Sequence, residues 1–231
     1  MNRVATVDDE IRLSRVLISV SDKSGLDLLV DRLVAIPNLE ILSTGGTFAR
    51  LHDLCPAGER HRLIQVSDYT GQPEMQGGLV KTLDFRIYLG LLSEPYNRFH
   101  DDDRARLGAG LIDMVVVNLY PFADTVARPD SDAEDARGNI DIGGPCMLRA
   151  AAKSYLRVAA VCDPTDYPTI AAELGARDGA LTLQTRFQLA KKAFAHTAAY
   201  DSAIADYLGA REFPTARAPY TVNRSAGEDD R

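Results

Sequence analysis

Apolar residues along this chain recur in two alternating patterns. Short β-branched runs such as Arg15–Val20 and Met114–Leu119 predict buried strands. Leu26–Leu33 and the longer Leu181–Leu208 carry apolar residues at helical spacing and predict helices. Three further strands are predicted at residues 39–43, 63–66 and 158–162. Strands that alternate with helices predict an α/β fold with a doubly wound, mostly parallel sheet and helices on both faces.

Polar, glycine-containing or hydroxyl-bearing turns follow the predicted strands. Ser21–Gly25 and Ser43–Thr47 come directly after the first two strands, and Ser67–Tyr69 and Asn118–Tyr120 follow two others. Ligands of open parallel sheets bind beyond the carboxyl ends of the strands. We therefore expect these four turns to line one site.

The same patterns divide the chain into three segments. Residues 1–14 are expected to form an N-terminal extension, residues 15–209 a single α/β domain, and residues 210–231 a tail or arm. The last segment is polar and lacks periodicity, which is typical of a loosely held terminus.

Composition excludes several classes of protein. A net charge of −7 argues against general binding to nucleic acid or to an anionic membrane, because both require a basic surface. The absence of a long apolar run and of an apolar leader predicts a cytoplasmic protein. Cys55, Cys146 and Cys162 are widely spaced and odd in number, as expected for reduced thiols. The four histidines lack metal-ligand spacing, so we expect no metal site.

Ser43-Thr44-Gly45-Gly46-Thr47 follows a predicted strand and opens a predicted helix. Hydroxyls and glycine-exposed N–H groups at a helix N-terminus suit an anion, although the same residues also form plain helix caps. The Ser21-Asp22-Lys23-Ser24 turn adds hydroxyls and one of only five lysines, against 21 arginines in the whole chain. Two such turns at one edge predict a phosphate site.

Four residues are candidates for proton transfer, and each also has a plain structural explanation. Lys81 in a loop is expected to be solvated, Tyr120 could be a core residue with a wet hydroxyl, and Asp141 could cap a helix. Lys153 lies in the predicted helix Pro145–Tyr155. Taken together at or near one rim, they form a candidate acid–base constellation.

The order of these motifs resembles the inosine monophosphate (IMP) cyclohydrolase domain of the bifunctional purine-biosynthesis enzyme. The resemblance runs from about Arg15 to Leu208, and no counterpart is recognised for either end of the chain. The segments that carry it are Ile18–Gly25, Leu42–Thr47, Val66–Met75, Val80–Leu83, Val117–Phe122, Asn139–Lys153 and Lys192–Tyr207.

The resemblance implies a methylglyoxal-synthase-like fold, a homodimer, and closure of 5-formamidoimidazole-4-carboxamide ribonucleotide to IMP with loss of water. This reaction needs no metal or organic cofactor. It implies that the 5′-phosphate is held by Ser21, Lys23, Ser43, Thr44, Gly45, Gly46 and Thr47. Positions that match the family's reacting-group residues are Lys81, Tyr120, Asp141 and Lys153. Positions that match those lining the base are Asn118, Ile142, Gly143 and Gly144, and Thr82 matches a further substrate contact.

The chain departs from the family pattern in one loop. The family reads G-R-V-K-T-L-H-P followed by a histidine–glycine stretch, whereas this chain has Leu79, Asp84, Phe85 and Tyr88 at the corresponding places. Arg86 is a candidate to restore the lost positive charge. Three functions stay open: a variant cyclohydrolase, which we favour, an enzyme acting on a related imidazole ribonucleotide, and a non-catalytic nucleotide-binding module.

The family's formyltransferase domain has no counterpart in this sequence. Either a separate formyl-transferring enzyme acts upstream as a partner, or the pathway differs here. The expected ligand is an anionic imidazole or purine ribonucleotide.

Overall fold

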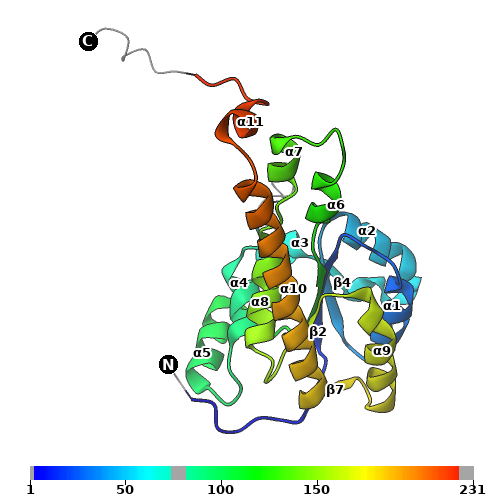
Figure 1. The fold of residues 1–231 in the computed structure, drawn as a ribbon. Coiled ribbons are helices and arrows are strands. Elements are labelled where there is room, and N and C mark those ends of the chain that lie inside the picture. Colours follow the sequence, from blue (N-terminus) through cyan, green and yellow to red (C-terminus); the bar gives the residue numbers. More distant parts are fainter. Residues whose placement is uncertain (1–2, 74–81, 224–231) are drawn as a thin grey trace. The chain divides into compact units, whose positions relative to one another are not determined.

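The computed structural model describes residues 3–73 and 82–223, and it contains a five-stranded parallel sheet in the order β4-β3-β2-β5-β6. This confirms the predicted α/β architecture (Figure 1). The sequence placed every strand of this sheet to within two residues at each end. The strands are β2 (Arg15–Val20), β3 (Glu40–Ser43), β4 (Leu63–Gln65), β5 (Met114–Asn118) and β6 (Ala159–Val161).

Helices cover both faces of the sheet (Figure 1). Helices α1 (Leu26–Val34), α2 (Gly45–Leu54) and α9 (Tyr167–Ala176) lie on one face. Helices α4 (Phe85–Leu92) and α8 (Gly143–Lys153) pack against each other on the other face. The remaining helices of the sheet unit are η1 (Ala57–Arg62), α3 (Val66–Thr70), α5 (Arg98–Leu107), η3 (Pro164–Asp166) and the first part of α10 (Leu183–Gly209).

The core lies between the sheet and these helices. Val16, Leu17 and Ile18 of β2 are fully buried, as are Met114 and Val115 of β5. Both strands lie inside the sheet and are covered on both faces, which explains their nearly continuous apolar sequences.

A second, two-stranded antiparallel sheet fixes the N-terminal segment. It pairs β1 (Glu10–Arg12) with β7 (Ala180–Thr182), neither of which the apolar pattern predicts. Arg186, only 1% exposed, holds this region together because its guanidinium donates hydrogen bonds to surrounding carbonyls. The carbonyls belong to Asp8, Asp9, Tyr155, Leu156 and Leu181.

A buried ion pair marks the amino edge of the sheet. Arg157 Nη1 lies 3.2 Å from Asp113 Oδ1, just before β5 begins. Asp113 Oδ2 also accepts the N–H group of Ser14 at 2.8 Å, just before β2. Arg157 Nη2 donates to the carbonyls of Gly90 and Leu91 near the end of α4. Helix α4 therefore ends at the amino edge.

By its contacts the chain divides into two compact units, one comprising residues 1–119 and 141–198 and the other residues 120–140 and 199–231. The second unit contains α6 (Phe122–Val126), α7 (Ala133–Gly138), the end of α10 and α11 (Phe213–Arg217). In this unit the buried ring of Phe122 packs edge-on against Tyr200 and Tyr207, with ring centroids 6.2 and 5.7 Å away. No helix in the described part of the chain is long and apolar enough to cross a membrane.

Candidate functional site at the carboxyl edge of the sheet

The turn after β2 is held by hydrogen bonds rather than by burial. The Ser21 and Asp22 N–H groups donate to Asn118 Oδ1 at 2.6 and 2.8 Å, and Asn118 Nδ2 donates to the Asp22 carbonyl at 2.8 Å. Asp22 Oδ1 accepts the hydroxyl and N–H of Ser24, which lowers the pKa of this carboxyl. Lys23 is exposed, and its ammonium donates to the Ser21 carbonyl at 3.3 Å.

The turn after β3 opens helix α2. Thr44 is the N-cap residue, and Gly45 has a φ of +45°, a left-handed conformation that favours glycine. The first N–H groups of a helix have no intrahelical acceptor, and those of Gly45 and Gly46 meet no other acceptor among the described residues. No atom of the described residues lies within 4 Å of a Cβ placed on Gly46. These two N–H groups are therefore available to an anion.

Two hydroxyls predicted to hold phosphate are used inside the fold instead. Ser43 is fully buried, and its hydroxyl donates to the Ile18 carbonyl at 2.7 Å. The Thr47 hydroxyl donates to the Val20 carbonyl at 3.0 Å and accepts the Val20 N–H at 3.1 Å. We therefore correct the prediction for these two side chains: they join β3 and α2 to β2.

The start of helix α8 gathers several of the other predicted residues. The Gly144 N–H donates to Asp141 Oδ1 at 2.8 Å. A Cβ on Gly143 would lie 2.8 Å from Thr82 Oγ1, and one on Gly144 would lie 2.7 Å from Leu119 Cδ2. Because Leu119 directly follows β5, the first turn of α8 lies at the carboxyl end of that strand. Ile142, which precedes the helix, is 60% exposed.

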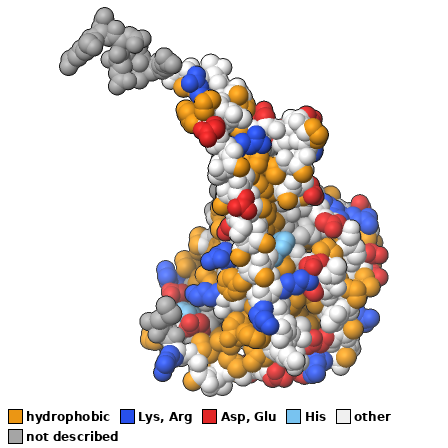
Figure 2. Space-filling model, viewed as in Figure 1, with side chains coloured by type: hydrophobic (Ala, Val, Ile, Leu, Met, Phe, Trp, Pro, Cys, Tyr) orange, Lys and Arg blue, Asp and Glu red, His pale blue; other side chains and the backbone are white. Residues whose placement is uncertain are grey.

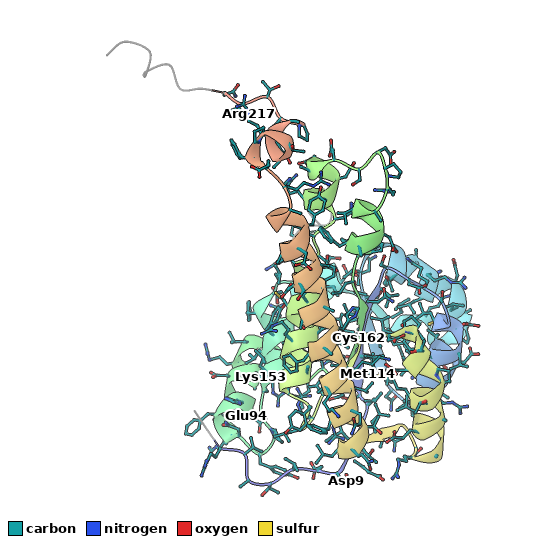
Figure 3. The ribbon with its side chains drawn as sticks, in the orientation of Figure 1. Asp9, Glu94, Met114, Lys153, Cys162 and Arg217 are labelled. Atoms are coloured by element: carbon teal, nitrogen blue, oxygen red, sulfur yellow. The ribbon has the colours of Figure 1, made fainter. Side chains whose placement is uncertain are left out.

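Lys153 does not lie at this rim within one copy of the chain. It is the last residue of α8 (Figure 3), ten residues after Gly143, so the two are about 15 Å apart along the helix axis. The chain continues from Lys153 to Ala159, whose N–H donates to the Asp113 carbonyl at the amino edge. The expectation that Lys153 shares one rim with Asp141 is therefore wrong for a single copy.

Two other catalytic candidates are not placed against this rim. Lys81 lies outside the described residues, as does Leu79. Tyr120 is 51% exposed and begins the second compact unit. The roles predicted for Lys81 and Tyr120 stay predictions.

Asp84 is the first of the altered loop positions that the structure describes. This buried carboxylate caps α4 by accepting the Arg86 N–H at 2.8 Å, and it accepts Gln72 Nε2 at 2.8 Å. Arg86 Nη1 donates to the carbonyls of Tyr69 and Thr70 at 3.0 and 3.1 Å, at the end of α3. Arg86 therefore stabilises α3, and this contact does not support its predicted role as a replacement cation for the substrate.

Tyr88 and Cys146 face each other between α4 and α8, a pairing that the sequence did not reveal. The Tyr88 hydroxyl is buried next to the Cys146 thiol, a weak hydrogen-bonding group, and meets no stronger partner among the described residues. Burial raises the pKa of Tyr88, and the nearby Cys146 thiol raises it further. Cys146 itself is exposed.

A charged cluster beyond the end of β6 was also missed. Lys192 Nζ lies 2.7 Å from Asp163 Oδ2 and 2.9 Å from Asp166 Oδ2. The hydrogen bond from Lys192 lowers the pKa of Asp163 to about 2. Burial lowers the pKa of the neighbouring His196. The segment Lys192–Tyr207 carried the family resemblance, but its sequence gave no sign that these charges meet at the sheet edge.

Exposed aromatic side chains lie on the first part of α10. Phe187 is 44% exposed, and Lys191 Nζ lies 5.9 Å from the centroid of its ring. Phe194 is 39% exposed, and Arg149 Cζ lies 5.6 Å from the centroid of its ring. Figure 2 shows apolar side chains between charged ones over this helix. Among the residues that the structure describes, no group of three His, Cys, Asp or Glu could hold a metal ion.

Comparison with known proteins identifies the family. Residues 26–146 match the family model of the MGS-like domain, and residues 151–228 match that of the AICARFT/IMPCHase bienzyme. A crystal structure of ForH is 32% identical and superimposes with a TM-score of 0.72, covering 85% of this chain and 100% of that one. The chain belongs to the MGS-like family, as a domain of the IMP cyclohydrolase kind.

This membership confirms the resemblance and links the chain to the enzymes of purine biosynthesis. The bienzyme match extends to residue 228, so most of the predicted tail does have a counterpart in that family.

Proposed function

We propose that this protein is an IMP cyclohydrolase, which closes 5-formamidoimidazole-4-carboxamide ribonucleotide to IMP. The observation that carries the proposal is the match of residues 151–228 to the bienzyme family. Anion-binding groups and a carboxylate at the carboxyl edge of the sheet support it.

The 5′-phosphate would be held between the turns after β2 and β3. The free N–H groups of Gly45 and Gly46 begin a ten-residue helix, whose dipole favours an anion at this end. Lys23 and the Ser21 hydroxyl lie on the turn of the neighbouring strand, and Thr44 adds a further hydroxyl. These groups provide local positive potential on a chain whose net charge is −7.

The base would lie toward the first turn of α8. The reaction forms a bond between the carboxamide nitrogen and the formyl carbon. One proton leaves that nitrogen and a second leaves the formamide nitrogen. The bond between the former formyl carbon and its oxygen breaks, a C=N bond to the formamide nitrogen forms, and the oxygen departs with both protons as water. Holding the two groups together supplies much of the acceleration in such an intramolecular closure. The Asp141 carboxylate would accept a hydrogen bond from the carboxamide N–H and so increase its nucleophilicity.

Contacts to the base and to the reacting oxygen complete the proposal. Thr82, Gly143 and Gly144 would line the base next to Asp141. Lys81 would stabilise negative charge on the formyl oxygen, and Tyr120 would relay a proton. The closure is an intramolecular condensation with loss of water that requires no redox step and no group carrier, so we assign it no cofactor.

Lys153 fits this mechanism only if it comes from a second copy of the chain. Its distance from Asp141 along α8 prevents both from acting within one copy. We therefore propose a homodimer with shared sites. We also propose that a separate enzyme supplies the formylated ribonucleotide.

Turnover of purified protein tests the function. The formamido ribonucleotide is added without metal or cofactor, and IMP is followed by absorbance and chromatography. We expect IMP to form, and we expect D141N to lose about 100-fold or more in kcat while still binding IMP. If the folded protein binds IMP without producing it, the protein is a binding module. If it converts a different imidazole ribonucleotide instead, the substrate assignment is wrong.

A further inference from the structure

The side-chain amide of Asn118 is engaged almost completely by the turn after β2. Its Oδ1 accepts two N–H groups, from Ser21 at 2.6 Å and Asp22 at 2.8 Å, and its Nδ2 donates to the Asp22 carbonyl at 2.8 Å. An amide oxygen has two lone pairs and an amide nitrogen two hydrogens. Only one N–H of Asn118 is therefore left for any other partner.

Asn118 is suited to this role by its place in the sheet. It is the last residue of β5 and pairs with Val20, the last residue of β2. The turn begins directly after Val20, where the ladder between the two strands ends. Asn118 thus extends the hydrogen bonding of the sheet by one step, through its side chain, onto the neighbouring turn.

Little else fixes this turn. Residues 22–25 are all exposed, so apolar packing does not hold them. Within the turn, Asp22 Oδ1 accepts the N–H and hydroxyl of Ser24, and Gly25 takes a φ of +66° before α1 begins. These local bonds shape the turn, but the Asn118 bonds are those that join it to β5.

We infer that Asn118 is a positioning residue for phosphate binding: it fixes the Ser21–Gly25 turn so that Ser21 Oγ and Lys23 face the phosphate. The inference rests on the proposed function, because it takes this turn as part of a phosphate site. It also revises the contact implied for Asn118 by the family resemblance, in which this position lines the base. The Ser21 and Asp22 N–H groups already bond to Asn118 and do not bind the phosphate.

The test compares three ligands on wild type and N118A. Ribose 5-phosphate carries only the phosphate half of the substrate, inosine only the base and sugar, and IMP carries both. Loss of three hydrogen bonds should loosen the turn and weaken the binding of IMP and ribose 5-phosphate about 10-fold or more. Binding of inosine should change less than about 2-fold. If Asn118 instead contacted the base, N118A would weaken the binding of inosine and IMP and leave the binding of ribose 5-phosphate unchanged.

N97A is the matched control. Asn97 Oδ1 also accepts two backbone N–H groups, from Phe99 and His100, but it caps α5. It lies three residues after Glu94 (Figure 3), beyond the end of α4 at the amino edge. We expect N97A to lower the free energy of unfolding without changing the affinity for any of the three ligands.

The outcomes separate this inference from the proposed function. If N118A binds ribose 5-phosphate as well as wild type, or loses inosine binding equally, the inference is wrong and the proposed function stands. If wild type binds ribose 5-phosphate but forms no IMP, the function is wrong, and weaker binding by N118A still supports the inference. If wild type binds neither phosphate compound, both are wrong.

Discussion

The Gly144 N–H group donates to Asp141 Oδ1 at 2.8 Å, and a Cβ on residue 144 would lie 2.5 Å from Asp141 Oδ2. The carboxylate is thus held against a helix start that only glycine permits. It reaches this position because the first turn of α8 packs on Leu119, at the end of β5. The backbone of α8 therefore fixes where the proposed catalytic carboxylate lies.

Replacing Gly144 with alanine should displace Asp141. The added Cβ would be closer to Asp141 Oδ2 and to Leu119 Cδ2 than real contacts allow, so the side chains or the helix must move. We expect kcat to fall about 10- to 100-fold, because a displacement of about 1 Å in a reacting group is costly. We also expect the free energy of unfolding, measured by urea denaturation, to fall by about 1–3 kcal/mol. G58A is the control, because no atom of the described residues lies within 4 Å of a Cβ placed there. An unchanged kcat in G144A would contradict a role for the close approach of residue 144 to Asp141.

Introducing a carboxylate at Gly46 should separate stability from ligand binding. The position is open, and an aspartate in the first turn of α2 interacts favourably with the helix dipole. We therefore expect the free energy of unfolding to stay constant or rise by up to about 1 kcal/mol in G46D. The new charge would occupy the proposed phosphate site, so the KM for the ribonucleotide should rise about 10-fold or more. G58D is the control for charge alone, and an unchanged KM in G46D would remove α2 from the phosphate site.

The strands were predictable because they follow from local patterns, and the same patterns are the source of the proposed site. Val16–Ile18 and Met114–Val117 show the continuous apolar character of strands covered on both faces, and the polar turns come directly after them. The edge at which those turns meet follows from the parallel order of the sheet.

Cross-strand partners were not predictable in the same way. The Ser43 hydroxyl bonds to Ile18, 25 residues away, and the Thr47 hydroxyl bonds to Val20, 27 residues away. These partners depend on strand order and register, which the sequence pattern does not specify. The burial of Arg186 likewise had no signal, because one arginine in a helix is usually solvated.

The separation of Lys153 from Asp141, by contrast, follows from the predicted helix alone. The predicted helix Pro145–Tyr155 already placed this lysine near its C-terminal end, far from Asp141. A rise of about 1.5 Å per residue would have separated the two from sequence alone.

The half-buried His196 should make the protein less stable in mild acid. Burial lowers its pKa below the usual value near 6.5, with Asp163 opposing and Lys192 adding to the shift. A group with a lowered folded-state pKa of this kind stabilises the fold fully above pH 6.5, and this contribution falls as the pH drops through the folded value. We expect the free energy of unfolding to decrease between pH 7 and 5, and to decrease less in H196Q.

Two comparisons make this pH dependence specific. H52Q is the control, because it removes a histidine that is exposed on α2. The Asp163 carboxyl, with a pKa of about 2, loses its contribution only between about pH 4 and 2, so the two groups act in separate windows. If stability falls with the same slope in wild type and H196Q between pH 7 and 5, His196 has the same pKa in the folded and unfolded protein, and the prediction is wrong.

Mixing two inactive variants tests whether Lys153 acts from a second copy. If each site combines Asp141 of one copy with Lys153 of the other, D141N and K153A should each be inactive alone. Subunits exchanged in a 1:1 mixture would form half of the dimers as heterodimers, each with one intact site in two. The mixture should therefore regain roughly a quarter of wild-type activity.

The alternatives to shared sites give different results. If Lys153 takes no part in the reaction, K153A alone should keep wild-type kcat, as expected for an exposed side chain at the amino edge. If both groups act within one copy, mixing should restore nothing, and the separation along α8 would have to change on substrate binding. Exchange is verified by tagging one variant and recovering both, so that absence of activity cannot result from unmixed dimers. The 15 Å between Lys153 and the first turn of α8 makes recovery of activity the expected result.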